Sequence, residues 1–317
     1  MTGTRTTKLL TYVFEVDEPL PKVRRWSLAD GLYLSSIPSF LLTQDDDYHV
    51  LAVTPEFSRF FRDNLHETTL NVEYQGRTDL NYEGWKSAEA EAKQKVDYYL
   101  LAAMLHSLHF LVPHASFVTM PDTEKICHSD RMKDFGRFDK AHKSALTKAD
   151  FNAIDRRYPV VSSILTSGQS GRLPTAICYY QQAFRTDIDL SVRFLGMMMA
   201  MESLFSHGAS SGVSHQVSER TALFLKASSR EQESLYAEMK KHYRLRSTIA
   251  HGGSSKKKSD DMTKPFGELL LILQASLSKV LGDSVLTDIF QSASSNALSR
   301  SLQNLVFRGK IVLPNDK

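Results

Sequence analysis

Residues 243–253 read Tyr-Arg-Leu-Arg-Ser-Thr-Ile-Ala-His-Gly-Gly, and most of the long apolar helix patterns lie in the same half of the chain. The periodicity before this stretch predicts a helix from Arg230 to His251, which the two glycines then stop, because glycine is common just past a helix end. Two arginines, a serine and a histidine therefore gather at the end of one helix. If the protein has chemistry, the sequence places it here.

A helical projection separates two faces of this segment. At about 100° per residue, one stripe contains Leu235, Met239, His242, Tyr243, Arg246, Ile249 and Ala250. Arg246 stands near the middle of this mostly apolar stripe, so its guanidinium needs an anion or a carbonyl as partner. Glu202, the one carboxylate in the apolar stretch 196–205, is the candidate. At the least, the pair is expected to be a structural strut between two helices.

Arg244, Ser247 and His251 share the other face, which this count turns toward solvent. Arg246 and His251 are five residues apart, which is about 140° around a helix, so a regular helix does not bring their side chains together. A helix that ends before His251 would allow it, and so would a site completed by a second subunit. The alternative is a structural arginine followed by a helix-ending histidine, since a helix C-terminus favours a cation.

The rest of the C-terminal half also has helical patterns. They cover residues 175–185, 187–206, 215–227, 266–281, 285–290 and 296–307. The most apolar stretch, 188–205, is interrupted by Asp189, Arg193 and Glu202, which is typical of a buried core helix rather than of a membrane span. Its methionine run, 197–199, is interpreted as core filling.

The N-terminal half is mixed. Strand patterns at residues 9–16, 32–34, 48–53 and 68–74 and a short helix at 55–64 predict a small α+β unit. A long helix pattern from Trp85 to Val112 follows, and then a polar segment that ends in the flexible turn 167–171. We therefore expect three parts, namely a small α+β domain (1–83), a connecting helix with a mixed middle segment (84–173) and a helical domain (174–308).

Composition bounds the class of protein. The chain has 317 residues, of which 42% are hydrophobic and 24% charged, and its formal net charge is +3. This is ordinary for a globular protein, and it permits an anionic partner without arguing for one. Cys127 and Cys178 are expected to be reduced thiols, and no apolar leader with a cleavage site begins the chain, so a cytoplasmic protein without a membrane span is expected.

His106 and His109 are spaced so that a helix would place them on one face, with His114 nearby, and Cys127 and His128 are adjacent. No acidic or thiol ligand stands at ligand spacing from them. Ordinary partners are therefore expected for these histidines, and no metal or cofactor. A metal-dependent hydrolase that uses His106 and His109 is the remote alternative.

Three segments carry a resemblance to a known family. Residues 243–252 resemble the R-x4-6-H signature of HEPN domains, closest to the Apea-like branch, whose pattern is Tyr-x-x-Arg-Ser-x-(aliphatic)-x-His-Gly. Residues 200–205, Ala-Met-Glu-Ser-Leu-Phe, resemble the Ala-x-Glu-Ser-Leu helix of that branch, and residues 218–225 resemble its Ser-Glu-Arg-x-Ala helix. The resemblance covers about residues 174–307, with the motifs in the family's order.

The resemblance implies a mainly α protein, with a C-terminal HEPN-type helical bundle preceded by the small α+β unit. Such bundles often dimerise, with two R-x4-6-H motifs facing one cleft. Many members are metal-independent endoribonucleases, several in toxin, antiphage defence or RNA-processing systems. The implied partners are thus RNA and a second copy of the chain. The implied reaction is attack of an RNA 2′-OH on its own phosphate, which yields a 2′,3′-cyclic phosphate.

The resemblance also implies roles for individual residues. His251 would be the general acid or base, since histidine changes charge near neutral pH, and Arg246 would hold the phosphate. Ser247, which stands where catalytic members often carry an amide or acid, would orient His251. Glu202 would anchor Arg246, and Arg244 is a second candidate arginine. The adjacent residues Lys256, Lys257 and Lys258 would contact RNA phosphates, or would form only a solvated loop.

A different class of function remains open. The helical domain could be a non-catalytic dimerisation or RNA-binding module in which Arg246 and Glu202 serve only as structural glue. In that case His251 would have no functional role.

Overall fold

The structure is a computed structural model that describes residues 5–14, 26–36, 68–76, 82–106, 113–119, 126–131, 148–168, 170–185, 187–206, 212–251, 262–292 and 295–308. The chain divides into two compact units, Met1–Ser162 and Ser163–Lys317, and each is described by itself. The described part of the chain is mainly α-helical, as the sequence predicted.

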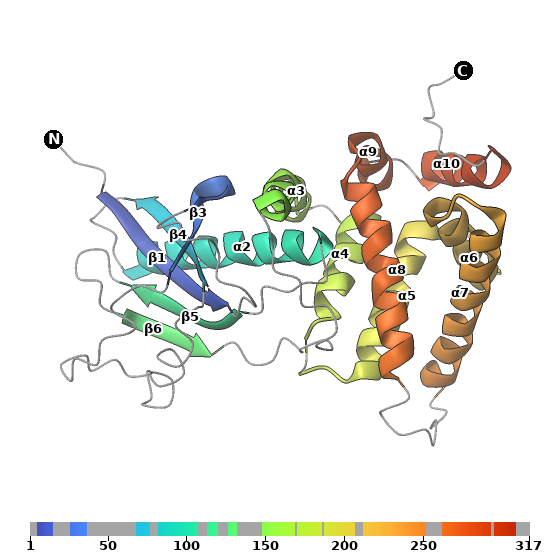
Figure 1. The fold of residues 1–317 in the computed structure, drawn as a ribbon, viewed down its shortest axis with the longest axis horizontal. Coiled ribbons are helices and arrows are strands. Elements are labelled where there is room, and N and C mark those ends of the chain that lie inside the picture. Colours follow the sequence, from blue (N-terminus) through green and yellow to red (C-terminus); the bar gives the residue numbers. More distant parts are fainter. Residues whose placement is uncertain are drawn as a thin grey trace. The chain divides into compact units, whose positions relative to one another are not determined.

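The first unit contains a six-stranded antiparallel sheet in the order β2-β3-β4-β1-β5-β6 (Figure 1). Its strands are β1 (Arg5–Phe14), β2 (Trp26–Ser27), β3 (Leu32–Ser36), β4 (Thr68–Gly76), β5 (Pro113–Thr119) and β6 (Ile126–Arg131). β1 pairs with β4 on one side and with β5 on the other. Each of these two pairings contains one register shift, at Lys8/Leu10 and at Val13/Phe14.

Helix α2 (Tyr82–His106) packs against β1 and β4. Its second half is buried almost without interruption from Val96 to Leu105. The short helix η1 (Ala29–Gly31) and helix α3 (Lys148–Thr166) are joined by a hydrogen bond of 2.9 Å from the Tyr158 hydroxyl to Asp30 Oδ2. Burial raises the pKa of Tyr158, and the hydrogen bond to Asp30 raises it further.

The division of the first unit differs from the one that the sequence predicted. β1, β3 and β4 lie where strands were expected, and α2 lies where the long helix was expected. β5, however, pairs with β1, so residues 113–119 belong to the sheet of the N-terminal strands rather than to a separate middle segment. Helix α3 was not predicted, because Pro159 lies inside it and a proline normally argues against a helix interior. The predicted strand 48–53 and helix 55–64 lie outside the described residues.

The described part of the second unit is helical. Its helices are α4 (Arg172–Gln182), α5 (Leu190–Phe205), α6 (Val213–Leu225), α7 (Ser229–Ala250), α8 (Thr263–Leu281), α9 (Ser284–Ser292) and α10 (Ser295–Arg308). All seven were predicted from periodicity, with boundaries that differ by a few residues. α5 packs against α4, α6, α7 and α8, and is therefore the central helix of this unit.

The position of α5 follows from its composition. Met197, Met198 and Met201 are fully buried, so the methionine run fills the core as predicted, whereas Met199 is 45% exposed. At the C-terminal end of α5, Phe205 meets Phe224 and Phe290 with ring centroids 5.4 and 6.2 Å apart. Pairs of this kind stabilise a core beyond the area that they bury.

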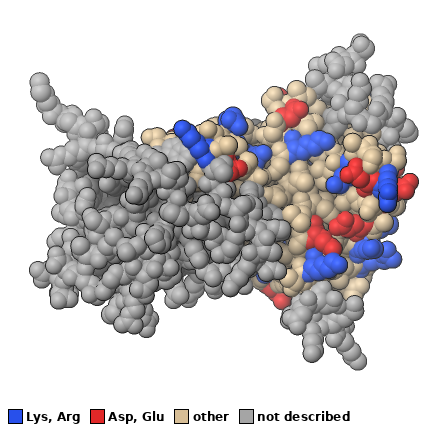
Figure 2. All heavy atoms as spheres, viewed as in Figure 1, with Lys and Arg blue, Asp and Glu red and all other residues tan. Residues whose placement is uncertain are grey.

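No single helix among the described residues is both long and apolar enough to cross a membrane. α8 and α9 meet the length and composition criteria only as a pair, and the chain bends by 106° between them. On the face of the helical unit seen in Figure 2, acidic and basic side chains are interspersed rather than separated.

The aromatic cluster gives the first prediction. Phe205→Ala should lower the free energy of unfolding by about 3–5 kcal/mol, because it opens a cavity that the neighbouring aromatic rings cannot move in to fill. Val192→Ala on the same helix is the control, since Val192 is 56% exposed and its truncation should cost less than about 0.5 kcal/mol. Urea unfolding measures both, and equal losses for the two variants would contradict the assigned core.

The N-terminus of α5 gives the second prediction. Asp189 is the N-cap, and its side chain accepts a hydrogen bond of 2.8 Å from the backbone N–H of Ser191. Asp189→Ala should therefore destabilise the protein by about 1 kcal/mol at neutral pH. Backbone N–H donation lowers the pKa of the Asp189 carboxyl below its ordinary value of 3.8. The stabilisation is present above the unfolded pKa and is lost as the pH falls through the lower, folded pKa.

The difference in the free energy of unfolding between wild type and Asp189→Ala should thus shrink as the pH is lowered below about 4. Urea unfolding at a series of pH values measures it. A difference that stays constant over that series would show that the carboxylate charge takes no part in the cap.

Candidate functional site

The motif at residues 243–252 lies at the end of α7. This helix begins at the N-cap Ser228, whose hydroxyl accepts from the Glu231 N–H, and it ends at Ala250. His251 is the C-cap, with φ −91° and ψ 14°, and its backbone N–H still donates to the Ser247 carbonyl at 3.1 Å. The helix thus ends just before His251, which is one of the two arrangements considered from the sequence, and a site completed by a second subunit stays a prediction. Gly252 and Gly253 lie outside the described residues.

Arg246 and Glu202 form the expected contact between α7 and α5. Arg246 Nε lies 3.3 Å from Glu202 Oε1, and Nη2 lies 3.4 Å from Oε2, so one edge of the guanidinium faces both carboxylate oxygens. The two side chains are 35% and 21% exposed. The ion pair that the sequence predicted is therefore present, although it sits at the border of the core rather than inside it.

Tyr243 is a buried neighbour of this pair. Its side chain is buried one turn before Arg246. Burial raises the pKa of the Tyr243 hydroxyl, and the negative charge of Glu202 raises it further, although the hydroxyl makes no hydrogen bond of ordinary geometry. The phenol therefore stays neutral beside the charge of Glu202.

The other face of α7 is exposed, as the helical projection predicted. Arg244, Ser247 and His251 are all exposed, and Arg244 Nε makes only a long contact of 3.4 Å to the Lys240 carbonyl. Among the described residues, Arg246 and His251 make no hydrogen bond with each other. The structure thus presents the two residues of the motif near one helix end without joining them.

The other two motif segments both contact the 200–205 segment, at the end of α5. Glu202 binds Arg246, and three residues later the Phe205 carbonyl accepts a hydrogen bond of 2.7 Å from Arg220 Nη1, which comes from α6. Arg172 of α4 donates to the carbonyls of Ser203 and Ser206 at the same end of α5. Desolvation lowers the pKa of both Arg172 and Arg220. The 200–205 segment is therefore in contact with both of the other segments that resemble the family, through Arg246 and through Arg220.

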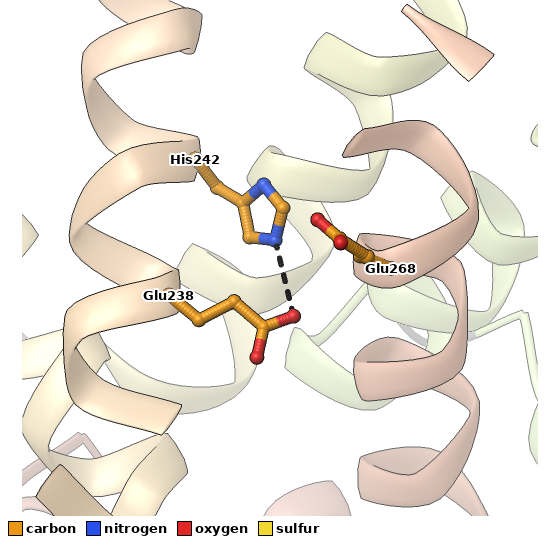
Figure 3. A group of neighbouring side chains, drawn as sticks. All are labelled: Glu238, His242 and Glu268. Carbon is orange, nitrogen blue, oxygen red and sulfur yellow. Dashed lines mark ion pairs between the residues drawn. The ribbon is translucent and has the colours of Figure 1, made fainter. Parts of the chain in front are cut away.

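Three residues of interest were not singled out as a group from the sequence. Glu238 and His242 on α7 and Glu268 on α8 turn toward one another (Figure 3). The signal in the sequence was the i,i+4 spacing of Glu238 and His242, which places both on one helix face. Glu268 comes from another helix, so only the fold could reveal it.

The remaining sequence candidates divide into two groups. His106 Nε2 lies 2.9 Å from Asp150 Oδ1, which is the ordinary partner that was expected. His109, Lys256, Lys257 and Lys258 lie outside the described residues, as do the side chains of His114, Cys127 and His128. Cys178 is exposed and forms no disulfide among the described residues.

The Arg246–Glu202 contact gives the third prediction. In a double-mutant cycle with Arg246→Met and Glu202→Gln, we expect a coupling of about 1–2 kcal/mol. This value lies between those of exposed and buried pairs, because both side chains are partly exposed. Urea unfolding measures it, and the exposed Arg185–Asp187 pair, which should show a smaller coupling, is the control. Additive effects at Arg246 and Glu202 would mean that the contact does not fasten α7 to α5.

Comparison with known proteins adds no assignment to this site. Neither a protein-family profile nor any curated protein or solved structure matches the chain. The interpretation of the site therefore rests on its residues and their geometry, together with the resemblance of the three motifs.

Proposed function

We propose that this chain is a metal-independent endoribonuclease of the HEPN type, which cuts single-stranded RNA by attack of a 2′-OH on the adjacent phosphate. In this proposal residues 174–308 form a HEPN-type helical bundle, and a small α+β unit precedes it. The contacts between the three motif segments support the proposal. Those segments were chosen from the sequence alone, and two of them bind the third at Glu202 and at Phe205.

The state of the Arg246 guanidinium is the observation that carries the proposal. Its Nη2 atom donates to Glu202 Oε2, and its Nε atom lies 3.3 Å from Glu202 Oε1 without a hydrogen bond of ordinary geometry, while Nη1 has no hydrogen bond among the described residues and the side chain is 35% exposed. A guanidinium that is anchored along one edge is oriented for a second anion along the other, and phosphate suits this fork geometry. An exposed histidine follows at the end of the same helix.

The proposed reaction needs two proton transfers. A base removes the proton of the 2′-OH, the 2′-oxygen forms a bond to phosphorus, and the bond from phosphorus to the 5′-oxygen breaks. An acid then protonates that 5′-oxygen, which leaves a 2′,3′-cyclic phosphate and a 5′-OH end. Arg246 would stabilise the charge that develops on the non-bridging oxygens. Ser247 and Arg244, which are exposed on the neighbouring face, would orient His251 or contact the RNA.

A second copy of the chain would complete the site. One histidine, His251, cannot act as base and acid at the same moment. It also lies about 7.5 Å beyond Arg246 along the α7 axis. Two motifs that face one cleft would supply two histidines and two arginines. The proposed partner is thus a second copy of the chain, which forms a homodimer through the helical domain. In this dimer Lys256, Lys257 and Lys258 would contact the RNA. A cytoplasmic toxin or antiviral defence effector fits this chemistry.

Cleavage of RNA gives the fourth prediction. Purified full-length protein should cut single-stranded RNA in EDTA and leave 2′,3′-cyclic phosphate ends. His251→Ala and Arg246→Ala should each lower the rate by at least about a hundredfold. His215→Ala is the matched control, because His215 is exposed on α6 and should leave the rate unchanged. Circular dichroism in the same buffer shows that each variant is folded.

Full activity of both folded variants would overturn the proposal, as would products that end in a 3′-hydroxyl. The second candidate is a non-catalytic dimerisation or RNA-binding module. The mixed charge pattern of Figure 2 favours it, since efficient capture of RNA usually relies on clustered cations. Binding of RNA or dimerisation, without cleavage and without any effect of His251→Ala, would identify this second function.

A further inference from the structure

Glu238 and His242 lie one turn apart on α7, and Glu268 faces them from α8 (Figure 3). One ligand atom from each residue lies within 4.8 Å of the others. His242 Nε2 is 3.9 Å from Glu238 Oε1, which is too long for a hydrogen bond. Two carboxylates and one imidazole therefore converge without a hydrogen bond between Glu238 and His242.

His242 distinguishes this group from a chance cluster of acidic residues on the surface. The residue is only 2% exposed, yet its Nε2 atom is buried without a hydrogen bond among the described residues. A buried imidazole nitrogen without a partner is costly, so it calls for an explanation. The ring is held in place by the edge of Phe194, with centroids 5.9 Å apart. In Figure 3 one ring nitrogen of His242 points toward the two carboxylates, which lie on the same side of the ring.

The charges around the cluster also favour a cation. Burial raises the pKa of Glu238, and the nearby charge of Glu268 raises it further. Burial lowers the pKa of His242, whereas the charge of Glu268 raises it. Lys264 offers only partial compensation, because its Nζ is 3.9 Å from Glu268 Oε1 and its side chain is 86% exposed. Lys241 lowers the pKa of both Glu238 and His242, because its positive charge favours the ionised carboxylate and the neutral imidazole.

We infer that Glu238, His242 and Glu268 bind a first-row divalent cation, with Zn²⁺ as the best match, and that this ion fastens α7 to α8. An imidazole together with carboxylates suits Zn²⁺, whereas Mg²⁺ and Ca²⁺ prefer oxygen ligands alone. Ligand atoms around tetrahedral Zn²⁺ are roughly 3.4 Å apart, so small side-chain movements would close the site. The carboxylate side chains are 36% and 38% exposed, which leaves a route for the ion and for a water ligand.

This site is separate from the proposed cleavage chemistry. His242 precedes Arg246 by one turn, or about 6 Å along the helix, and it lies on the buried stripe rather than on the exposed face. The ion would hold the helix that carries the motif and would take no part in cleavage. Binding and melting measurements therefore test it independently of any ribonuclease activity.

The fifth prediction is that the full-length chain, stripped of metal with a chelator, binds one Zn²⁺ per protomer with a dissociation constant below about 10 µM. Isothermal titration with Zn²⁺ alone measures this. Saturating Zn²⁺ should raise the melting temperature by roughly 5 °C. Titration with Co²⁺ should give visible absorption bands from an ion bound by nitrogen and oxygen.

Glu238→Gln and Glu268→Gln keep the size of each side chain and should weaken Zn²⁺ binding at least about tenfold. Without metal, these variants should melt no lower than wild type, because they remove like-charge repulsion. Glu233→Gln, an exposed residue on the same helix, and His215→Ala are the matched controls and should bind as wild type does.

The highest Zn²⁺ concentration tested, 100 µM, is about ten times the expected upper limit of the dissociation constant. If no 1:1 binding is found at that concentration, the inference is overturned. Binding that survives in both glutamine variants, or that is lost in His215→Ala, would also overturn it.

Discussion

The contact between Arg246 and Glu202 is the constraint on which the helical unit depends. A guanidinium stands on a stripe that is otherwise apolar, and it finds one carboxylate, on the central helix α5, at 3.3 and 3.4 Å. If either group moved away, the charge of the other would be left unpaired near the core. The contact therefore sets how α7 lies on α5, and with it where the end of α7 and His251 are presented.

The end of α5 is organised by the same kind of interaction. The last carbonyls of a helix have no intrahelical partners, and here Arg220 and Arg172 supply donors for Phe205, Ser203 and Ser206. Positive charge is also favoured at a helix C-terminus. Three arginines from three helices thus hold one turn and a half of α5, next to a fully buried cluster of aromatic rings. Two of these arginines, Arg220 and Arg246, belong to the motif segments, and both contact the third segment at this end of α5.

Much of this arrangement was predictable from periodicity. The seven helices of the second unit and the buried part of the α7 stripe, from Leu235 to Tyr243, followed from periodicity, whereas Ala250 at the end of that stripe is exposed. The partner of Arg246 followed from Glu202 being the one carboxylate in an apolar stretch. The Glu268 contact did not, because it joins residues that are far apart in the sequence and on different helices. The pairing of β5 with β1 was missed for the same reason, since strand partners are chosen by the fold. Met199 was predicted as core with its neighbours, but one residue in a run must face outward on a helix packed on several sides.

The central claim is that Arg246 and His251 act on a phosphate whose nucleophile is the neighbouring 2′-OH. The most direct test is to offer the full-length protein one RNA sequence in two forms, unmodified and fully 2′-O-methylated, in EDTA. We expect the unmodified RNA to be cut to cyclic-phosphate ends, and the methylated RNA to stay intact and to act as a competitive inhibitor. Cleavage of the methylated RNA would contradict the claim.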